Sequence, residues 1–423
     1  MDIKQFKTGK SFAKELDAAD PLREYRSKFH IPKDETGQEV IYLCGNSLGL
    51  QPKSVRAFVE QELKDWQTLG VKGHLRARNP WVPYHELLTE QTARLVGAKP
   101  VEIVVMNTLT VNLHLMMVSF YRPTPQRNKI VIESNAFPSD QYAVESQIKF
   151  KGYDPNRSLI ELQPRGGETT IRTEDIETFL EREGDSIALV MLGGVNYYTG
   201  QLFEMDRITR SAHEKGCVVG FDLAHAAGNA VLRLHEWDVD FAIWCSYKYL
   251  NGGPGCVAGC FVNEKHAMNT ELPRFSGWWG HNKETRFLMG PQFDPILGAE
   301  GWQLSNPPIL PLAALRASMD IFDEVGMDMI RAKSELLTGY LEFLLDQHPN
   351  KSFCVMTPKD PKQRGAQLSI RVEGKGKALY ESITAQGVVC DWREPDVIRV
   401  APVALYNSFM DVFRFVEICV SSC

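Results

Sequence analysis

The sequence lacks long apolar segments and dense basic runs. No apolar stretch approaches the ~20 residues that a membrane-spanning helix needs. Residues 1–7 contain no apolar core of the signal-peptide kind. Acidic and basic residues are mixed along the chain and give a formal net charge of -6, so no basic patch is available for nucleic-acid phosphates. These absences argue against membrane and nucleic-acid partners, and we expect a cytoplasmic protein.

A disulfide pattern is also missing. The nine cysteines are an odd number and are scattered, and several of them, such as Cys217, Cys245 and Cys260, lie in apolar runs. This usage is typical of reduced, buried thiols in a cytosolic protein. Cys256 and Cys260 have no histidine or cysteine partners nearby in the sequence, so we interpret them as packing residues and predict no metal site.

What the chain does have is an alternation of short apolar runs and helical segments. From about residue 86, strand-like runs such as 101–106, 130–132, 187–192 and 217–221 alternate with stretches of helical pattern, and a further strand is expected over 388–391. This order predicts an α/β fold with a mostly parallel sheet that helices cover on both faces. Ligands bind such sheets outside the carboxyl ends of the strands.

Length and composition allow two domains. The 423 residues are 43% hydrophobic and 24% charged, as in an ordinary globular protein. After about residue 310 the helices lengthen and a smaller α/β unit closes the chain, and we expect a short strand near residue 41 to join this unit. The expected parts are an N-terminal arm or peripheral helix (1–35), a segment that contributes to the small domain and to active-site loops (36–85), a large ligand-binding domain (86–310) and a C-terminal small α/β domain (311–423).

Lys248 lies between an apolar run, residues 241–244, and a glycine-rich turn, residues 252–255. The run predicts a buried strand, and the turn predicts a tight loop. This lysine has two interpretations. Either it caps the strand end with its ammonium group in water, or it is a held amine for Schiff-base chemistry with a carbonyl compound. On this segment alone the first interpretation is favoured, because lysine is seldom fully buried.

An acid after a neighbouring strand changes this balance. Asp222 follows the run 217–221 directly, so it can face Lys248 across one sheet edge. The pair is a buried salt bridge or a pyridoxal phosphate site. In such a site the aspartate keeps the pyridine nitrogen protonated and the lysine forms the Schiff base.

The other groups that a pyridoxal site needs are also present. Leu109 and Thr110 stand at a predicted helix start, where backbone N–H groups and a hydroxyl suit a phosphate. Phe137 or His225 can stack on the ring, and Arg399 can bind a substrate carboxylate. Each group is a weak signal alone, but together they favour the pyridoxal interpretation.

Several segments resemble the kynureninase family, in the family's order and over nearly the whole chain. They are residues 43–49, 106–112, 137–140, 221–226, 244–251, 277–281, 305–308 and 399–402. The resemblance implies a fold-type I enzyme near the class V aminotransferases, with pyridoxal 5'-phosphate as cofactor. It also implies a homodimer with shared active sites and a small amino-acid substrate of the kynurenine type.

The resemblance implies roles for individual residues. Lys248 is the Schiff-base lysine, Asp222 pairs with the pyridine nitrogen, and Arg399 is expected to hold the substrate α-carboxylate. In relatives a hydroxyl residue often stands where this chain has Gly193, so we assign that position no role. The other residues expected around the cofactor are Leu109, Thr110 and Tyr247 at its phosphate, Phe137, Pro138, Ser139, Asp140 and His225 around its ring, and Trp278 and Asn306 from the second subunit.

The implied reaction is hydrolysis of the Cβ–Cγ bond of L-kynurenine or 3-hydroxy-L-kynurenine. The products are L-alanine and anthranilate or 3-hydroxyanthranilate, in tryptophan catabolism or NAD biosynthesis. Lys248, once freed by the substrate amine, can shuttle the α-proton. A general acid or base is also needed near the γ-ketone, and Tyr247 is our hypothesis because it adjoins the lysine.

Substrate preference rests on fewer residues. His74, Ser305 and Asn306 match positions that in eukaryotic-type relatives favour 3-hydroxykynurenine, and an amide can hydrogen-bond the extra hydroxyl. Ser47 is also expected beside the substrate. We therefore predict a preference for 3-hydroxykynurenine, with the alternative that His74 is an ordinary loop residue.

Two other functions are compatible with the sequence. A class V relative such as an aminotransferase or a cysteine desulfurase shares the fold, but a desulfurase needs an exposed, reactive cysteine on a mobile loop. Cys423 is terminal and the other cysteines lie in apolar runs. A pyridoxal fold kept only as an interaction scaffold is disfavoured, because Lys248, Asp222 and Arg399 are all present.

Overall fold

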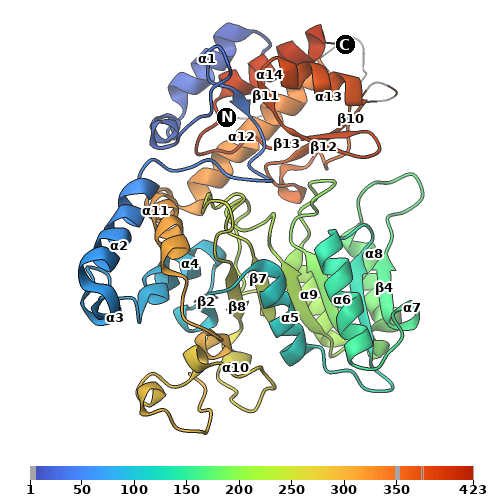
Figure 1. Ribbon diagram of the computed structural model, residues 1–423. Helices are drawn as coiled ribbons and strands as arrows, with labels where there is room; N and C mark the ends of the chain where they lie inside the picture. Colours follow the sequence, from blue (N-terminus) through green and yellow to red (C-terminus); the bar gives the residue numbers. More distant parts are fainter. Residues whose placement is uncertain (1–5, 348–352, 373, 375, 423) are drawn as a thin grey trace.

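The computed structural model describes residues 6–347, 353–372, 374 and 376–422. A central sheet of seven strands forms the larger part of the molecule (Figure 1). Its order is β2-β8-β7-β6-β5-β3-β4. The strands are β2 (Ile103–Val105), β3 (Lys129–Glu133), β4 (Leu159–Leu162), β5 (Ile187–Gly193), β6 (Val218–Asp222), β7 (Phe241–Trp244) and β8 (Gly259–Val262).

The central sheet is mostly parallel, as predicted. Strands β4, β3, β5, β6 and β7 run parallel, whereas β8 is antiparallel to both of its neighbours, β7 and β2. The chain passes from β7 to β8 without a crossover helix, and a short connection of that kind joins antiparallel strands. That connection, residues 245–258, contains Lys248.

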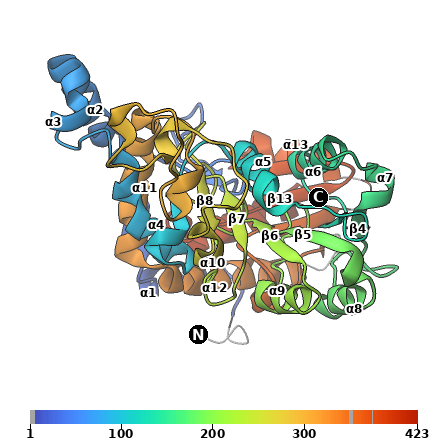
Figure 2. The same ribbon diagram turned by 90° about the horizontal axis from the view of Figure 1, so that it is seen from below.

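Helices cover both faces of the central sheet because its strands are apolar on both sides. Ile130 and Ile132 of β3 pack into one core with α5 (Leu109–Phe120) and α6 (Pro138–Phe150). Val131, between them, packs into the other core with α8 (Thr173–Glu183) and α9 (Met205–Glu214). Figure 2 shows these two helix layers above and below the sheet.

A second sheet belongs to the C-terminal part of the chain. It is antiparallel, with the order β12-β13-β10-β9. A separate short pair, β1 with β11, is parallel and confirms that the strand near residue 41 joins this part. The bounds are β1 (Ile41–Tyr42), β9 (Phe353–Val355), β10 (Leu368–Val372), β11 (Val388–Val389), β12 (Asp391–Arg393) and β13 (Val397–Val400).

The helices α12 (Met327–Asp346), α13 (Gly376–Ala385) and α14 (Phe409–Ser421) pack with this C-terminal sheet. Helix α1 (Lys10–Ala19) joins the same core through Phe12 and Leu16, so the N-terminal segment contains the peripheral helix. The domain bounds themselves stay a prediction.

The remaining helices connect the two sheets or line the edge of the central one. Helix α11 (Ile309–Val325) packs along α2 (Val55–Leu69), and α2 and α3 project from the body (Figure 2). The other α-helices are α3 (Gly73–Arg76), α4 (Thr89–Val96), α7 (Pro155–Ser158) and α10 (Glu264–Ala267). The 3-10 helices are Arg23–Lys28, Gly70–Lys72, Tyr84–Leu88, Pro100–Glu102, Gly184–Ser186, Trp278–Gly280, Arg286–Leu288, Ala299–Trp302 and Pro361–Gln363.

Two predicted strands have other bounds in the structure, and one strand was not predicted. The strand expected over 101–106 begins at Ile103, because residues 100–102 form a 3-10 turn. The strand expected over 388–391 is divided at Cys390, since β11 pairs with β1 and β12 pairs with β13. Strand β4 was not predicted, because this edge strand is only partly buried. No helix in the described part of the chain is long and apolar enough to cross a membrane.

Candidate active site

A cavity of about 160 Å³ opens at the carboxyl ends of the central strands. Strands β3, β5 and β6 end at this cavity, and helices α5 and α6 begin there. The lining residues are Leu109, Thr110, Glu133, Phe137, Ser139, Asp140, Gly193, Val195, Tyr197, Asp222, Ala224, His225, Tyr247 and Lys248. The structure therefore brings together most of the residues that were predicted around a cofactor.

Lys248 is half-buried in the connection that follows β7. Its Nζ lies 3.0 Å from Nε2 of His225 and 5.6 Å from the ring centroid of Phe137. The backbone around it is tightly packed. A Cβ at Gly49 would meet the carbonyl oxygen of Lys248 at 2.3 Å, and a Cβ at Gly252 would meet Sγ of Cys256 at 2.5 Å. The two glycines therefore permit the close turns that hold the lysine in the cavity.

Asp222 ends β6 and is buried. Its Oδ1 accepts a hydrogen bond of 2.7 Å from the backbone N–H of Ala224. The side chain of Asp140 donates a hydrogen bond to Asp222. Burial raises the pKa of both acids, most strongly at Asp140, where the negative charge of Asp222 adds to the effect. The shared proton therefore belongs to Asp140, and Asp222 is the ionised member, which the charge of Lys248 also favours.

His225 follows the same strand and is fully enclosed. Its pKa is held well below the ordinary value by burial first, and then by the positive charges of Lys248, Arg399 and Arg393. The ring is therefore neutral, and its Nε2 can accept a hydrogen bond from Nζ of Lys248. Its Nδ1 is buried and has no hydrogen-bond partner among the described residues. A ligand group or a water molecule would satisfy this atom.

Tyr247 faces the cavity beside the lysine, and its ring centroid is 5.9 Å from Nζ of Lys248. Burial raises the pKa of its phenol, and the neighbouring Cys245, with which it shares a hydrogen bond, adds to this effect. The phenol is therefore protonated at neutral pH and can act as a donor.

The first turn of α5 supplies an anion-binding edge. Leu109 and Thr110 are its first residues, and Thr108 at the N-cap makes no side-chain cap bond. Leu109 and Thr110 both line the cavity, and the first N–H groups of a helix have no partner within the helix. Helix α6 begins nearby at Pro138, with Phe137 at its N-cap and Asp140 in its first turn.

Arg399 approaches the cavity from the C-terminal sheet and is buried. Its Nη1 donates a 2.7 Å hydrogen bond to the carbonyl oxygen of Tyr197, a cavity residue. Its Nε donates to Oδ1 of Asp391 at 3.1 Å, and its Nη2 also binds that carboxylate. Arg393 binds the same carboxylate at 3.1 Å. Two guanidinium groups therefore share one acid beside the cavity.

Several other predicted residues lie outside this cavity in the single chain. Trp278 lines a separate hollow of about 320 Å³ together with His281 and Arg286. His74 lies on α3 with its ring centroid 5.5 Å from that of Trp81. Ser47, Ser305 and Asn306 are exposed and do not line the cavity, and Pro138 forms the helix start behind it.

Five cavity residues were not predicted from the sequence. They are Glu133, Gly193, Val195, Tyr197 and Ala224. Glu133 carries a signal that could have been used, because it follows a predicted apolar strand just as Asp222 does. Ala224 lies close to Asp222 in the sequence. Nothing in the sequence marks Val195 and Tyr197, which lie in the loop after β5, as site residues.

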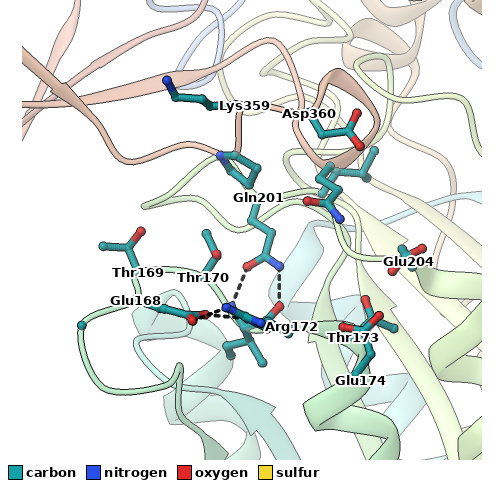
Figure 3. Close-up of a pocket in the computed structure, with 15 residues that line it drawn as sticks. Glu168, Thr169, Thr170, Arg172, Thr173, Glu174, Gln201, Glu204, Lys359 and Asp360 are labelled. Carbon is teal, nitrogen blue, oxygen red and sulfur yellow. Dashed lines mark hydrogen bonds and ion pairs between the residues drawn. The ribbon is translucent and has the colours of Figure 1, made fainter.

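A larger hollow, of about 640 Å³, lies where residues 167–174 and 201–204 meet residues 358–363 (Figure 3). Its buried amide, Gln201, holds both backbone groups of Ile171, at 2.6 and 3.0 Å. Arg172 and Glu168 pair with each other. Glu174 and Glu204 pair with Arg207, and Lys359 pairs with Asp346. The hollow therefore offers space without an evident reactive group.

One group of potential metal ligands, His85, Glu86 and Glu300, has its ligating atoms within 4.8 Å of one another. Nζ of Lys283 lies 3.0 Å from Glu86 and 2.5 Å from Glu300. The lysine thus supplies the positive charge that this group needs.

Solved structures identify the class of the fold. The apo cysteine desulfurase from Thermococcus onnurineus NA1 matches with a TM-score of 0.75 at 18% identity, over 93% of this chain and 98% of that one. The cysteine desulfurase CsdA from Escherichia coli matches with a TM-score of 0.77 at 17% identity, over 95% and 98%. The fold is that of the fold-type I pyridoxal phosphate enzymes.

Sequence relatives identify the family. The chain is 64% identical to the kynureninase of Koribacter versatilis and 61% identical to that of Myxococcus xanthus, each over 97% of both chains. It is 51% identical to the kynureninase of Nematostella vectensis, over 96% of this chain and 92% of the relative. A family model, the kynureninase C-terminal domain, matches residues 330–419. The chain belongs to the kynureninase family, and it is a hydrolase with pyridoxal 5'-phosphate as cofactor.

The cavity fits this cofactor. The open helix start at Leu109 and Thr110 suits its phosphate, and the ionised Asp222 suits a protonated pyridine nitrogen. The buried, unpartnered Nδ1 of His225 offers a further polar contact. Lys248 is placed between them with its amine in the cavity.

Proposed function

We propose that the cavity around Lys248 hydrolyses the Cβ–Cγ bond of L-kynurenine or 3-hydroxy-L-kynurenine. The products are L-alanine and anthranilate or 3-hydroxyanthranilate. The main support for this proposal is that Lys248, neutral His225 and the Asp222–Asp140 pair line one cavity together with the first turn of α5. When bound, the cofactor supplies an electron sink for bond cleavage at the amino-acid carbons.

The residues of the central sheet hold and orient the cofactor in this proposal. Lys248 is its point of covalent attachment, and Asp222 accepts the hydrogen bond of the pyridine N–H. The other binding groups are Leu109, Thr110 and Tyr247 at the phosphate and Phe137, Pro138, Ser139, Asp140 and His225 around the ring. Phe137 faces the lysine amine at 5.6 Å, which leaves its ring directed into the cavity.

Two residues move protons. The Nζ of Lys248, once released by the substrate amine, takes the α-proton and returns it, and neutral His225 at 3.0 Å accepts a hydrogen bond from it. Tyr247, whose phenol remains protonated at neutral pH, gives a proton to the reacting chain at the γ-carbon side.

The C-terminal sheet binds the substrate carboxylate. Arg399 bonds to Asp391 and Tyr197 with only some of its N–H groups. We assign the remaining N–H groups to the α-carboxylate of the substrate. Asp391 holds Arg399 in one orientation, and Arg393 on the same acid keeps the local charge positive.

The second subunit completes the site in our proposal. Trp278 and Asn306 lie outside the cavity of their own chain, and Trp278 is exposed. In a homodimer with shared sites they would reach the cavity of the other subunit. His74, Ser47, Ser305 and Asn306 then line the aryl end of the substrate, where an amide favours the 3-hydroxyl group. The family's place in tryptophan catabolism or NAD biosynthesis and a cytoplasmic location stay predictions.

The test is incubation of the purified protein and pyridoxal phosphate with each substrate. We expect alanine together with anthranilate or 3-hydroxyanthranilate in equal amounts. A protein that binds the cofactor yet releases no alanine from either substrate would contradict the proposal.

A further inference from the structure

A third buried acid lines the cavity and has no part in the reaction above. Glu133 is the last residue of β3 and is 5% exposed. It shares the cavity with Asp140 and Asp222, which belong to α6 and β6. A buried carboxyl group is costly unless it has a partner or a task.

The partner of Glu133 is the backbone of the neighbouring strand. The N–H of Gly193, at the end of β5, lies 3.3 and 3.2 Å from the two carboxyl oxygens of Glu133. Gly193 is in register with Asp222 on β6. The next residue, Gly194, donates a 2.7 Å hydrogen bond from its N–H to the carbonyl oxygen of Asp222. Glu133 therefore holds the two-glycine turn that itself holds Asp222.

Gly193 leaves room for this contact. A Cβ built at position 193 would lie 2.9 Å from Oε1 of Glu133, which is closer than real Cβ atoms approach a neighbour. Any side chain at this position would displace the carboxyl group. The glycine therefore leaves the carboxyl group of Glu133 in its place against β5.

The surroundings of Glu133 make its charge responsive to pH. Burial raises its pKa to about 7, and the charge of Asp222 adds to this effect, whereas the N–H of Gly193 and the side chain of Asn196 oppose it. The other ionisable groups on the same cavity are Asp140 from α6, Tyr197 from the loop after β5, Tyr247, His225 and Lys248.

We propose that Glu133 is a positioning residue for the pyridine end of the site: it fixes the Gly193–Gly194 turn against Asp222, and its charge adds to that of Asp222. The inference rests on the proposed function only in placing the pyridine nitrogen at Asp222. When Glu133 is ionised, the extra negative charge stabilises positive charge on the bound cofactor. When Glu133 is protonated, Asp222 acts alone.

The first test is a pH titration of the visible absorbance of the holoenzyme without substrate. Glu133→Gln keeps the shape and an acceptor for Gly193 but removes the charge. We expect the midpoint of the absorbance transition to fall by half a pH unit or more, because a nearby negative charge is lost. Glu161→Gln, on the exposed edge strand β4, is the matched control and should leave the midpoint unchanged.

A second variant keeps the test decisive if Glu133→Gln does not fold. Gly193→Ala places a methyl group against the carboxyl of Glu133, and we expect a midpoint shift in the same direction. Midpoints equal to those of the unchanged protein, in whichever of the two variants folds, would overturn the inference. If the unchanged protein does not cleave kynurenine but the variants still show the lowered midpoint of the absorbance transition, the proposed function is contradicted and the role of Glu133 stands.

Thermal unfolding of the cofactor-free chain of 423 residues gives an independent readout. The pKa of Glu133 is raised on folding, so the folded state holds the proton more tightly, and stability falls as the pH rises from about 4.5 to about 7. Glu133→Gln removes this loss. Its Tm relative to the unchanged protein should therefore be higher at pH 8 than at pH 5, by about 2 °C. A Tm difference that is the same at both pH values would count against the inference.

Discussion

The two sheets bring ionisable side chains of opposite sign to the candidate active site. The central sheet and its helix α6 contribute three buried acids, Glu133, Asp140 and Asp222, around Lys248. The C-terminal sheet contributes two arginines, Arg393 and Arg399, which share one acid.

The acids of the central sheet have raised pKa values, so their protonation can be adjusted by a neighbour. Guanidinium groups keep their charge at any physiological pH. The side that we assign to the cofactor is therefore suited to proton control, and the side that we assign to the substrate is suited to permanent charge. Tyr197 joins them, since its ring lines the cavity while its carbonyl oxygen binds Arg399.

The largest expected effect is the loss of Lys248, which lines the cavity. Lys248→Ala should remove the covalent attachment and the proton carrier together, and turnover should fall by at least ~10³-fold. The visible absorbance band of the attached cofactor should also disappear. Lys265→Ala, which removes a lysine paired with Asp238 away from the cavity, is the control and should retain both band and turnover. Retained turnover in the Lys248 variant would remove the lysine from the mechanism.

Tyr247→Phe tests the central-sheet side without changing its charge. The phenol proton is lost while the ring remains, so we expect kcat to fall on the order of 10²-fold. The visible absorbance of the bound cofactor should persist, because Lys248 is unchanged. Stopped assays at several substrate concentrations separate kcat from KM. An unchanged kcat would exclude Tyr247 from the proton path.

Much of this arrangement could be predicted from the sequence, and the reason differs between residues. Asp222 and Lys248 were found because an ionisable residue at the end of an apolar strand is unusual and because parallel strands bring such ends together. Glu133 carries the same signal, yet one acid after a strand is more often solvated than buried. Its burial depends on Gly193 in another strand, which is a tertiary contact.

Other features depend on surroundings that the sequence does not display. The pairing of Arg399 with Asp391 follows from the register of β12 and β13, in which the two residues lie opposite each other. Strand β4 was not predicted because it is a short edge strand in which one residue is buried and the others are partly or fully exposed. Trp278 and Asn306 lie outside the cavity of their own chain, so their predicted roles require a second subunit that one chain does not contain.

Arg399→Gln tests the C-terminal side. Losing one charged, bidentate contact with the substrate carboxylate should lower kcat/KM by about 30-fold, chiefly through KM. Arg399→Lys retains the charge and should recover only part of this loss, since lysine cannot bind in the same fork. The absorbance of the bound cofactor should not change in either variant. Arg414→Gln, exposed on α14, is the control.

In these Arg399 variants, an altered absorbance with an unaltered KM would reverse the assignment of the two sides.

Asp391→Asn refines the same test. Its amide can still accept one hydrogen bond but no longer fixes both nitrogens of Arg399. We expect a smaller rise in KM than in Arg399→Gln.

The smallest effect concerns the aryl end of the substrate, which neither sheet provides. Helix α3, which projects from the body with α2 (Figure 2), carries His74, whose ring packs against Trp81. Asn306 is exposed. If these residues hydrogen-bond the 3-hydroxyl group across a subunit boundary, Asn306→Ala should reduce the preference for 3-hydroxykynurenine by about 5-fold, as expected for one neutral hydrogen bond. His74→Ala should act in the same direction. Steady-state kinetics on both substrates measure this ratio. A clear preference of the unchanged protein for unhydroxylated kynurenine would show that the aryl end is not built to bind a hydroxyl group, whatever the two variants do.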